Sequence, residues 1–292
     1  MLLVTGATGH TGRFLLEELK NSGKDYKIRC FVRKDSPRIK YLENYDVEIA
    51  FGDMEDEASL KNALKNVETV IHIVNIKYSP VIAGLSAEAG VRKIIFIHTT
   101  GMFSKFRALA EDYKKIEDYI IENCKIDYVI LRPTMIYGTT NDHNMHKLIQ
   151  YIKGHNIFPV FGSGKSLMQP VHARDLARAV VLAMDAPGAV NKGYNISGGN
   201  ALSYREILKL IAGRVNPGIR FIYIPYRISM ILGGLYNLVF HMAGKKGQIS
   251  IEQIKRLSEN KNYDFYEAQK DFGYSPITFE EGIEEEIKSM GY

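Results

Sequence analysis

Short apolar runs alternate with amphipathic segments along the first two thirds of the chain. Runs of this kind are typical of strands buried on both faces of a sheet. The predicted strands are residues 1–4, 26–32, 47–50, 69–74, 94–98, 126–131 and 193–196. Between them, apolar residues recur at helical spacing, as in residues 14–19, 79–89 and about 107–123. This alternation predicts an α/β fold with a doubly wound parallel sheet, whose ligands bind beyond the carboxyl ends of the strands.

The turn after the first predicted strand carries glycines in the spacing Gly6-x-x-Gly9-x-x-Gly12. Gly6 allows a sharp turn off the strand, Gly9 leaves room for a pyrophosphate, and Gly12 lets the next helix pack closely on the sheet. Backbone amides and the positive end of the helix dipole then face the anion. Side chains that add donors here are Thr8, His10, Thr11 and Arg13. We therefore predict a bound dinucleotide, and the alternative is a tight turn without a ligand.

The second predicted strand ends in two cations, Arg33 and Lys34. In nucleotide folds this strand end meets the adenosine ribose, and an acidic residue there bonds both ribose hydroxyls of NAD. Cations suit the 2′-phosphate of NADP instead. We expect NADP, with NAD as the alternative, and a solvated basic turn is the explanation that needs no ligand.

Composition narrows the class of protein. Of 292 residues, 46% are hydrophobic and 24% are charged, as in globular proteins. The net charge of +5 comes from scattered basic residues, so it permits an anionic ligand but does not indicate nucleic acid. The histidines and the two cysteines, Cys30 and Cys124, form neither HExxH nor CxxC, so no metal site is predicted. No signal peptide precedes the first strand, which favours a reduced, cytoplasmic setting.

One apolar stretch, residues 228–240, lies in the C-terminal third. It is shorter than the ~20 residues that span a bilayer, and it contains Gly233, Gly234 and Asn237. We expect a buried helix and no membrane span. The alternative is a contact with a membrane surface or with another subunit.

The glycine turn resembles the TGxxGxxG signature of the short-chain dehydrogenase/reductase superfamily, in its extended and atypical branches (epimerase/dehydratase-like and NmrA-like). Stretches that resemble motifs of extended members follow in order at residues 131–138, 161–164, 171–177, 272–276 and 280–282. The resemblance implies a Rossmann-type core of residues 1–133 plus about 167–196. It also implies a smaller C-terminal substrate lobe of about 134–166 plus 197–292.

The resemblance also implies the contacts with the cofactor. Asp53 is expected to bond the adenine amino group and Met54 to pack on the ring, although Asp53 or Asp56 also suits the cap of a helix beginning near Glu57. Residues near later strand ends are expected on the ribose, the phosphates and the nicotinamide. They are Val74, Asn75, Thr99, Pro133, Met135 and Ile136.

The helix of residues 107–123 departs from the family pattern. Active members carry Tyr-x-x-x-Lys, in which the tyrosine is the general acid/base and the lysine lowers its pKa and holds the ribose. Four residues after Tyr113 stands Glu117, so the pair is absent in its usual form. The remaining catalytic candidates are Thr99, Thr100 and Tyr113, and Lys114 is a candidate for the ribose. The alternative is that Tyr113, Lys114 and Glu117 form a solvated helix face.

The substrate side of the site differs from sugar-nucleotide enzymes as well. They usually place an arginine four residues before the position of His172, where this chain has Met168, and Lys165 is a candidate substitute. The loop after Gly138 is crowded with polar residues that suit either a polar substrate or an ordinary loop. They are Asn141, Asp142, His143, Asn144 and His146.

From these motifs we expect an NAD(P)-dependent oxidoreductase or epimerase. It would exchange hydride with a carbonyl or carbinol carbon of a small molecule, and a nucleotide sugar is one candidate. Two alternatives remain: a non-catalytic NADP-binding sensor or assembly protein, which the missing lysine favours, and a quinone- or flavin-directed reductase. A homodimer is left open.

Overall fold

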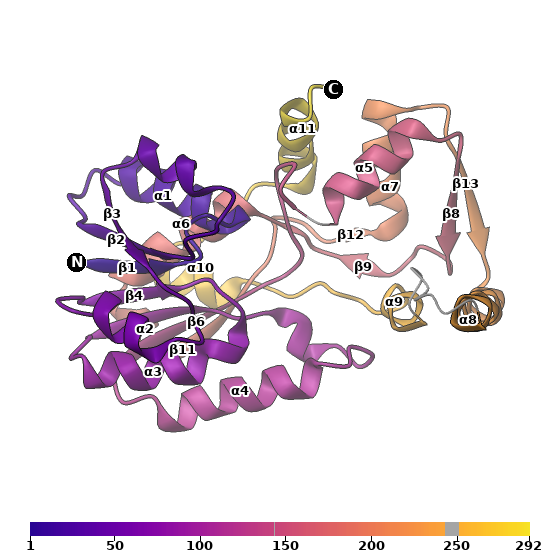
Figure 1. Cartoon of the computed structure of the whole chain (residues 1–292). Coiled ribbons are helices and arrows are strands. Elements are labelled where there is room, and N and C mark those ends of the chain that lie inside the picture. Colours follow the sequence, from indigo (N-terminus) through magenta and orange to yellow (C-terminus); the bar gives the residue numbers. More distant parts are fainter. Residues whose placement is uncertain (143, 243–250) are drawn as a thin grey trace.

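A computed structural model gives the arrangement of the chain and describes residues 1–142, 144–242 and 251–292; the side chains of residues 235 and 238–242 are not described. It confirms the predicted α/β fold. Seven parallel strands form one sheet in the order β11-β6-β5-β4-β1-β2-β3 (Figure 1). They are β1 (Leu2–Thr5), β2 (Ile28–Val32), β3 (Val47–Phe51), β4 (Thr69–His72), β5 (Lys93–Ile97), β6 (Asp127–Pro133) and β11 (Lys192–Ile196). Each of the predicted strands is present, with differences only at its ends.

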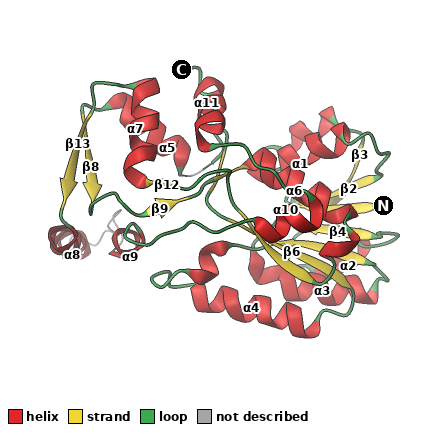
Figure 2. Ribbon diagram, turned by 180° about the vertical axis from the view of Figure 1, so that it is seen from behind, coloured by secondary structure: helices red, strands yellow, loops and turns green. Residues whose placement is uncertain are grey.

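Helices cover both faces of this sheet (Figures 1 and 2). One face packs against α1 (His10–Asn21), α6 (Ala173–Asp185) and α10 (Tyr266–Phe272), the other against α2 (Glu57–Ala63), α3 (Ser79–Glu88) and α4 (Ala110–Asn123). Successive strand side chains point to opposite faces, so Val4 belongs to the cluster of Leu15 and Leu16, and Leu3 to that of Leu60. Short 3₁₀ turns complete the connections: η1 (Ile39–Asn44), η2 (Ile76–Tyr78), η3 (Thr100–Phe103) and η4 (Pro187–Ala189).

Many of the remaining elements pack around a separate hydrophobic cluster built on Ile149, Ile211 and Ile283. We call the remaining elements the C-terminal lobe, and the predicted bounds of core and lobe stay a proposal. The strands pair as β10-β7, β12-β9 and β13-β8. The strands are β7 (Ile136–Tyr137), β8 (Ile157–Phe161), β9 (Leu167–Met168), β10 (Val171–His172), β12 (Leu202–Ser203) and β13 (Arg220–Ile224). The helices are α5 (Met145–Gly154), α7 (Tyr204–Val215), α8 (Tyr226–Met242), α9 (Ile251–Arg256) and α11 (Phe279–Ser289).

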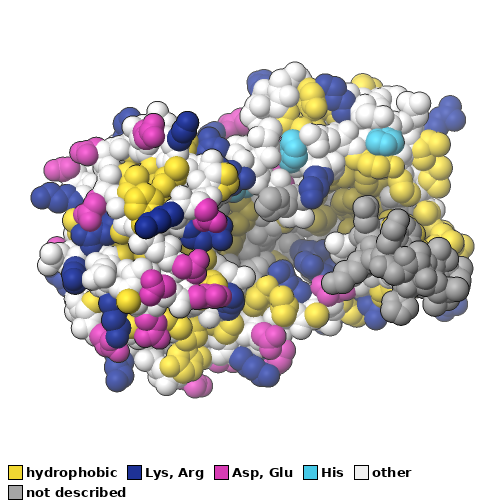
Figure 3. All heavy atoms as spheres, in the orientation of Figure 1, with side chains coloured by type: hydrophobic (Ala, Val, Ile, Leu, Met, Phe, Trp, Pro, Cys, Tyr) yellow, Lys and Arg dark blue, Asp and Glu magenta, His cyan; other side chains and the backbone are white. Residues whose placement is uncertain are grey.

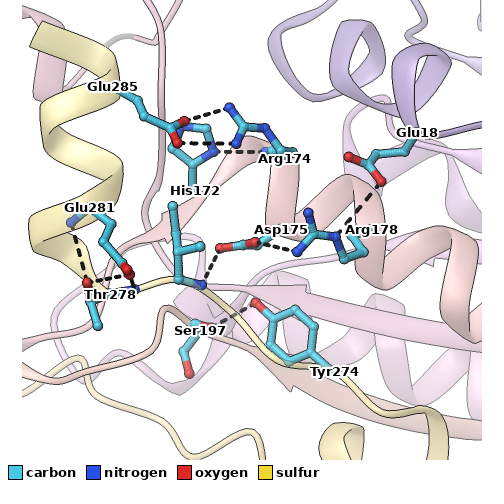
Figure 4. A network of polar contacts seen from close by, with 11 residues as sticks. Glu18, His172, Arg174, Asp175, Arg178, Ser197, Tyr274, Thr278, Glu281 and Glu285 are labelled. Carbon is cyan, nitrogen blue, oxygen red and sulfur yellow. Dashed lines mark hydrogen bonds and ion pairs between the residues drawn. The ribbon is translucent and has the colours of Figure 1, made fainter. Parts of the chain in front are cut away.

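The stretch of residues 171–177 joins the lobe to the sheet (Figure 4). Arg174 in the first turn of α6 forms a bidentate ion pair with Glu285 of α11. Asp175 is buried, and its carboxylate accepts a hydrogen bond of 3.0 Å from the backbone amide of Ile277. Burial raises the pKa of Asp175. The motif therefore holds α11 and the lobe in a fixed position next to the strand ends.

The apolar stretch of residues 228–240 does form a helix, α8, but the prediction that it is buried is wrong for its described part. Ile228, Ile231 and Leu232 are exposed. The helix contacts α9 through small residues instead, because a Cβ on Gly233 would meet Ile254. Among the described residues, every helix is too short or too polar to cross a membrane.

Candidate functional site

A cleft of about 480 Å³ lies beyond the carboxyl ends of β1, β2, β3 and β4. In the strand order, β1 and β4 are neighbours from which the chain winds in opposite directions. Ligands of doubly wound sheets bind at such a reversal. The cleft is lined by Gly6, Thr8, Gly9, His10, Thr11, Phe31, Val32, Arg33, Ser36, Gly52, Asp53, Met54, Ile73, Val74 and Tyr78.

The glycine turn forms one wall of this cleft. Gly6 has a φ of +78°, in the left-handed region that favours glycine, and the amide of Gly9 donates to its carbonyl at 2.9 Å. A Cβ on Gly12 would lie 2.3 Å from the carbonyl oxygen of Gly6, so α1 packs on the turn at a distance that only glycine permits. Since α1 begins at His10, and Gly9, His10 and Thr11 line the cleft, the N-terminus of the helix lies at the cleft, as an anion site requires.

Most predicted cofactor residues are brought together here: Gly6, Thr8, Gly9, His10, Thr11, Arg33, Asp53, Met54 and Val74 all line the cleft, and Gly12 lies beneath it. Lys34 borders an adjoining hollow with Arg33 and Asp53. Asn75 lies outside the lining, and its side chain accepts from the amide of Lys77. Asp56 caps α2 by accepting from Ala58, which agrees with the capping interpretation for that residue.

Sequence reasoning missed part of this lining. The Ser36 hydroxyl lies in the cleft and donates to Thr8 Oγ1 at 3.1 Å. Arg33 is largely exposed on the rim, and its Nε lies 3.8 Å from a carboxylate oxygen of Asp35. The rim therefore carries an acid next to its cations. The sequence signal for this acid was Asp35, two residues after the strand-end cation Arg33.

A second cavity lies beyond β5 and β6 and is lined by both parts of the molecule. Its residues are Thr99, Thr100, Gly101, Ser104, Arg107, Thr134, Met135, Asn144, Met168, Gln169, Pro170, Arg256, Lys261 and Tyr263. Of the predicted residues it holds Thr99, Thr100 and Met135. Pro133 is buried beside it and accepts a hydrogen bond from Thr100, and Ile136 lies outside the lining. Thr99 Oγ1 accepts from the amide of Gly101 at 3.0 Å, which fixes its rotamer.

Tyr113 and Lys114 lie outside the residues that line either cavity. The Tyr113 hydroxyl accepts a hydrogen bond of 3.1 Å from Arg107, and the same guanidinium lies over its ring. Arg107 lines the second cavity, so Tyr113 is connected to that cavity indirectly, through its hydrogen bond with Arg107. Lys114 is exposed on α4.

Glu117 is buried, so the interpretation that it belongs to a solvated helix face is wrong for this residue. Its carboxylate accepts from His98 Nδ1 at 2.9 Å and from Arg132 Nε at 2.7 Å. Burial opposes its ionisation, but the bonds from His98 and Arg132 hold the pKa of Glu117 below its usual value. Burial lowers the pKa of His98, and the neutral ring accepts from Ser79 at Nε2 (3.1 Å). This network fixes the end of β5, directly before Thr99.

The second cavity is cationic. Arg107, Arg256 and Lys261 line it, and the Arg256 guanidinium lies 3.7 Å from Glu252. Burial, and then the charge of Arg256, lower the pKa of Lys261 to about 8. Lys261 forms an isolated β-bridge with Met168, which stands where sugar-nucleotide enzymes usually have an arginine. A cavity with these charges suits a substrate that carries an anionic group.

Two further candidates are placed differently. Lys165 is exposed and lies outside the lining of the second cavity, whereas Lys261 belongs to that lining. In the polar loop, Asn144 lines the cavity, whereas buried Asp142 accepts from the amides that open α5 and acts as a cap. His143 lies outside the described residues. Those residues contain no group of side chains suited to a metal ion.

Comparison with known proteins identifies the family. A model described as the NmrA-like family matches residues 1–275. The chain belongs to the NmrA-like family. The chain is 20% identical to N-acetyl-alpha-D-glucosaminyl-diphospho-ditrans,octacis-undecaprenol 4-epimerase of Escherichia coli O157:H7, over 98% of this chain and 94% of that one.

Two more proteins are similar to this chain. The mitochondrial NADH dehydrogenase (ubiquinone) 1 alpha subcomplex subunit 9 of Arabidopsis thaliana is 24% identical over 77% of this chain, which spans 60% of that subunit's length. The crystal structure of an NADPH-dependent quinone oxidoreductase from Escherichia coli superposes with a TM-score of 0.75 at 19% identity, and each chain is covered completely. This NmrA-like chain thus shares its fold with oxidoreductases of the superfamily.

Proposed function

We propose that the protein is an NAD(P)-dependent oxidoreductase or epimerase, with NADP preferred, that acts on a carbonyl or carbinol carbon of a small anionic molecule. One observation carries the proposal: a glycine-turn cleft and a cationic cavity follow neighbouring strands at the same edge of one parallel sheet. Figure 3 shows Lys and Arg side chains within the hollow between the two parts. A dinucleotide that extends along this edge would have its diphosphate at the turn and its redox end near Thr99 and Met135.

The turn fits a dinucleotide because its close contacts exclude any side chain at Gly12. When bound, NAD(P) supplies or accepts the hydride. In the proposed mechanism the chain's residues do the rest. Thr99 positions the substrate oxygen, and Arg107 and Lys261 hold the anionic group. Thr99 and Thr100 are the candidates for the cavity-wall hydroxyl that moves the proton, and Tyr113, outside the lining, acts only by positioning Arg107.

The absence of the usual Tyr-x-x-x-Lys pair supports the alternative of a non-catalytic nucleotide sensor or assembly protein. The similarity to a subunit of NADH dehydrogenase points the same way. A quinone-directed reductase is the third candidate, because the quinone oxidoreductase from Escherichia coli has this fold.

Turnover separates these candidates. Oxidation of NADPH or NADH is followed with quinones and small aldehydes, and the epimerisation of sugar nucleotides is followed by chromatography, because an epimerase consumes no net cofactor. Each assay is run with wild type, Thr99→Ala and the exposed control Thr140→Ala. The proposal predicts turnover that Thr99→Ala lowers by about tenfold or more and Thr140→Ala leaves unchanged. Tight binding of a dinucleotide without turnover of any substrate class supports the sensor instead, and unchanged activity in Thr99→Ala removes that residue from the mechanism.

A further inference from the structure

Helix α8 packs against the rest of the lobe through its smallest residues. The hydroxyl of Ser229 is buried and donates to the carbonyl of Ile224 at 3.0 Å. A Cβ on Gly233 would lie 2.7 Å from Ile254 Cδ1 of α9. Ser229 and Gly233 are four positions apart, so they lie on one face of the helix. In the described part of α8, the residues that the protein covers most fully, Ser229 and Gly233, are therefore small.

The large aliphatic residues of α8 point the other way. Ile228, Ile231 and Leu232 are 48%, 62% and 47% exposed. Their spacing of three and four places them in one stripe on the outer face of the helix. A helix of a globular protein ordinarily turns such a stripe toward the core and its polar residues toward water. Here the order is reversed over the described part of α8.

The apolar surface extends onto the strand that leads into α8. Ile222 of β13 and Ile157 of β8 are both 50% exposed, and the register pairs Ile157 with Arg220, two residues before Ile222. The two isoleucines thus share the outer face of the β8-β13 pair, while Phe158 and Phe221 pack on its inner face. Figures 1 and 2 both show α8 at the end of this pair, and Figure 3 shows hydrophobic side chains along that edge. We call Ile157, Ile222, Ile228, Ile231 and Leu232 the α8 patch.

The segment of the sequence that carries most of the α8 patch has charge of one sign. Between Glu206 and Glu252 the sequence contains no Asp or Glu. The same segment contains the cations Lys209, Arg214, Arg220, Arg227, Lys245 and Lys246, of which the last two lie outside the described residues. Arg220 and Arg227 are exposed and belong to the same strand and helix as the α8 patch. The neighbouring helix α9 does carry an acid, Glu252, but its carboxylate lies 3.7 Å from the Arg256 guanidinium. An apolar stripe on a strand and a helix that carry arginines is complementary to a surface of anionic headgroups.

We propose that the α8 patch docks the protein on the surface of an anionic lipid bilayer, with α8 lying in the plane of the interface. A helix of 17 residues is long enough to lie there, and it is not one that can span the membrane. A second copy of the chain fits less well, because a two-fold contact would bring Arg220 and Arg227 of both copies into one interface. Since α8 packs on α9, which supplies Arg256 to the second cavity, docking also brings that cavity close to the bilayer.

Flotation of the full chain with lipid vesicles tests the proposal. The vesicles are phosphatidylcholine alone or phosphatidylcholine with about one third phosphatidylglycerol. The double variant Ile231→Ser/Leu232→Ser removes two of the three large residues of the stripe, and Arg227→Glu reverses a bordering charge. Ile121→Ser, on exposed α4 of the opposite part, is the matched control, since Ile121 is 49% exposed. Melting temperatures and light scattering are recorded for every variant.

We expect flotation with the anionic vesicles that weakens as salt increases, and about tenfold less with phosphatidylcholine alone. The double variant should partition at least about tenfold less, Arg227→Glu severalfold less, and Ile121→Ser as wild type, all with wild-type melting temperatures. Absence of flotation with either vesicle overturns the proposal. So does a dimer that the double variant dissociates without any vesicle binding, because the occupant of the patch is then a second copy.

Discussion

Replacing Glu117 by Gln tests whether the buried network under the end of β5 is a structural unit. The Glu117 carboxylate accepts hydrogen bonds from His98 at 2.9 Å and from Arg132 Nε at 2.7 Å, and a terminal nitrogen of Arg132 forms an ion pair with it at 2.6 Å. Gln removes the negative charge and turns an NH₂ group toward a donor. The side chain of Arg132 is only 16% exposed, so the variant leaves a largely buried cation without a counter-charge.

Breaking one partner of a buried ion pair costs about 3–5 kcal/mol of unfolding free energy. Gln keeps one carbonyl acceptor and nearly the same volume, so we expect the lower end, about 3 kcal/mol. For comparison, Glu122 lies exposed on the same helix, and Glu122→Gln should change the unfolding free energy by less than about 0.5 kcal/mol.

Urea unfolding of the two variants at neutral pH measures both numbers. A second experiment measures the unfolding free energy as a function of pH. Because the pKa of Glu117 is lowered in the folded protein, its stabilisation is present above the unfolded value of 4.5 and is lost as the pH falls through the folded pKa. Wild type should therefore lose this stability in acid and Glu117→Gln should not. A cost below about 1 kcal/mol, or parallel pH profiles, would refute the network as described.

Three more predictions follow from single contacts. Arg33→Ala should weaken NADPH binding about tenfold and leave NADH binding unchanged in a fluorescence titration; equal losses for both contradict the role given to Arg33. Gly12→Ala places a Cβ 2.3 Å from a carbonyl oxygen, so dinucleotide binding and melting temperature should both fall, whereas Gly84→Ala, with open space around it, should be neutral or stabilising. Burial, and then Asp142, raise the pKa of Glu286 from 4.5 to about 10, so the folded state keeps a proton that the unfolded chain loses as pH rises. Glu286→Gln should match wild type at pH near 4.5 and exceed it in stability by a margin that grows toward pH 8; a constant margin means that Glu286 is ionised in the folded protein.

The sheet and the glycine turn could be predicted because their signals are local. Each strand is a short apolar run, and the distances between Gly6, Gly9 and Gly12 decide the turn without help from the rest of the chain. The cleft residues follow from the same logic, since they stand directly after those strands. Asp53 and Met54 are examples that line the cleft where the sequence predicts them.

The second cavity could not be predicted in this way, because its walls come from distant segments. Lys261 reaches it from beyond α9, more than 150 residues after Thr99 in the chain, and only the tertiary fold brings the two together. Glu117 has the flanking residues of an exposed helix position, and its burial depends on Arg132 from the next strand. The α8 patch could not be predicted, because an apolar helix ordinarily buries its large residues. In α8 the small residues are buried instead.

The central claim is that the amides of the glycine turn hold a dinucleotide diphosphate, with its redox end at Thr99 and Met135. A crystal of the protein soaked with NADPH tests it most directly. The account predicts diphosphate oxygens within hydrogen-bonding distance of the backbone amides between Gly9 and Gly12, and the nicotinamide over the second cavity. An empty cleft at millimolar NADPH, or one filled by side chains of the protein itself, would contradict the account.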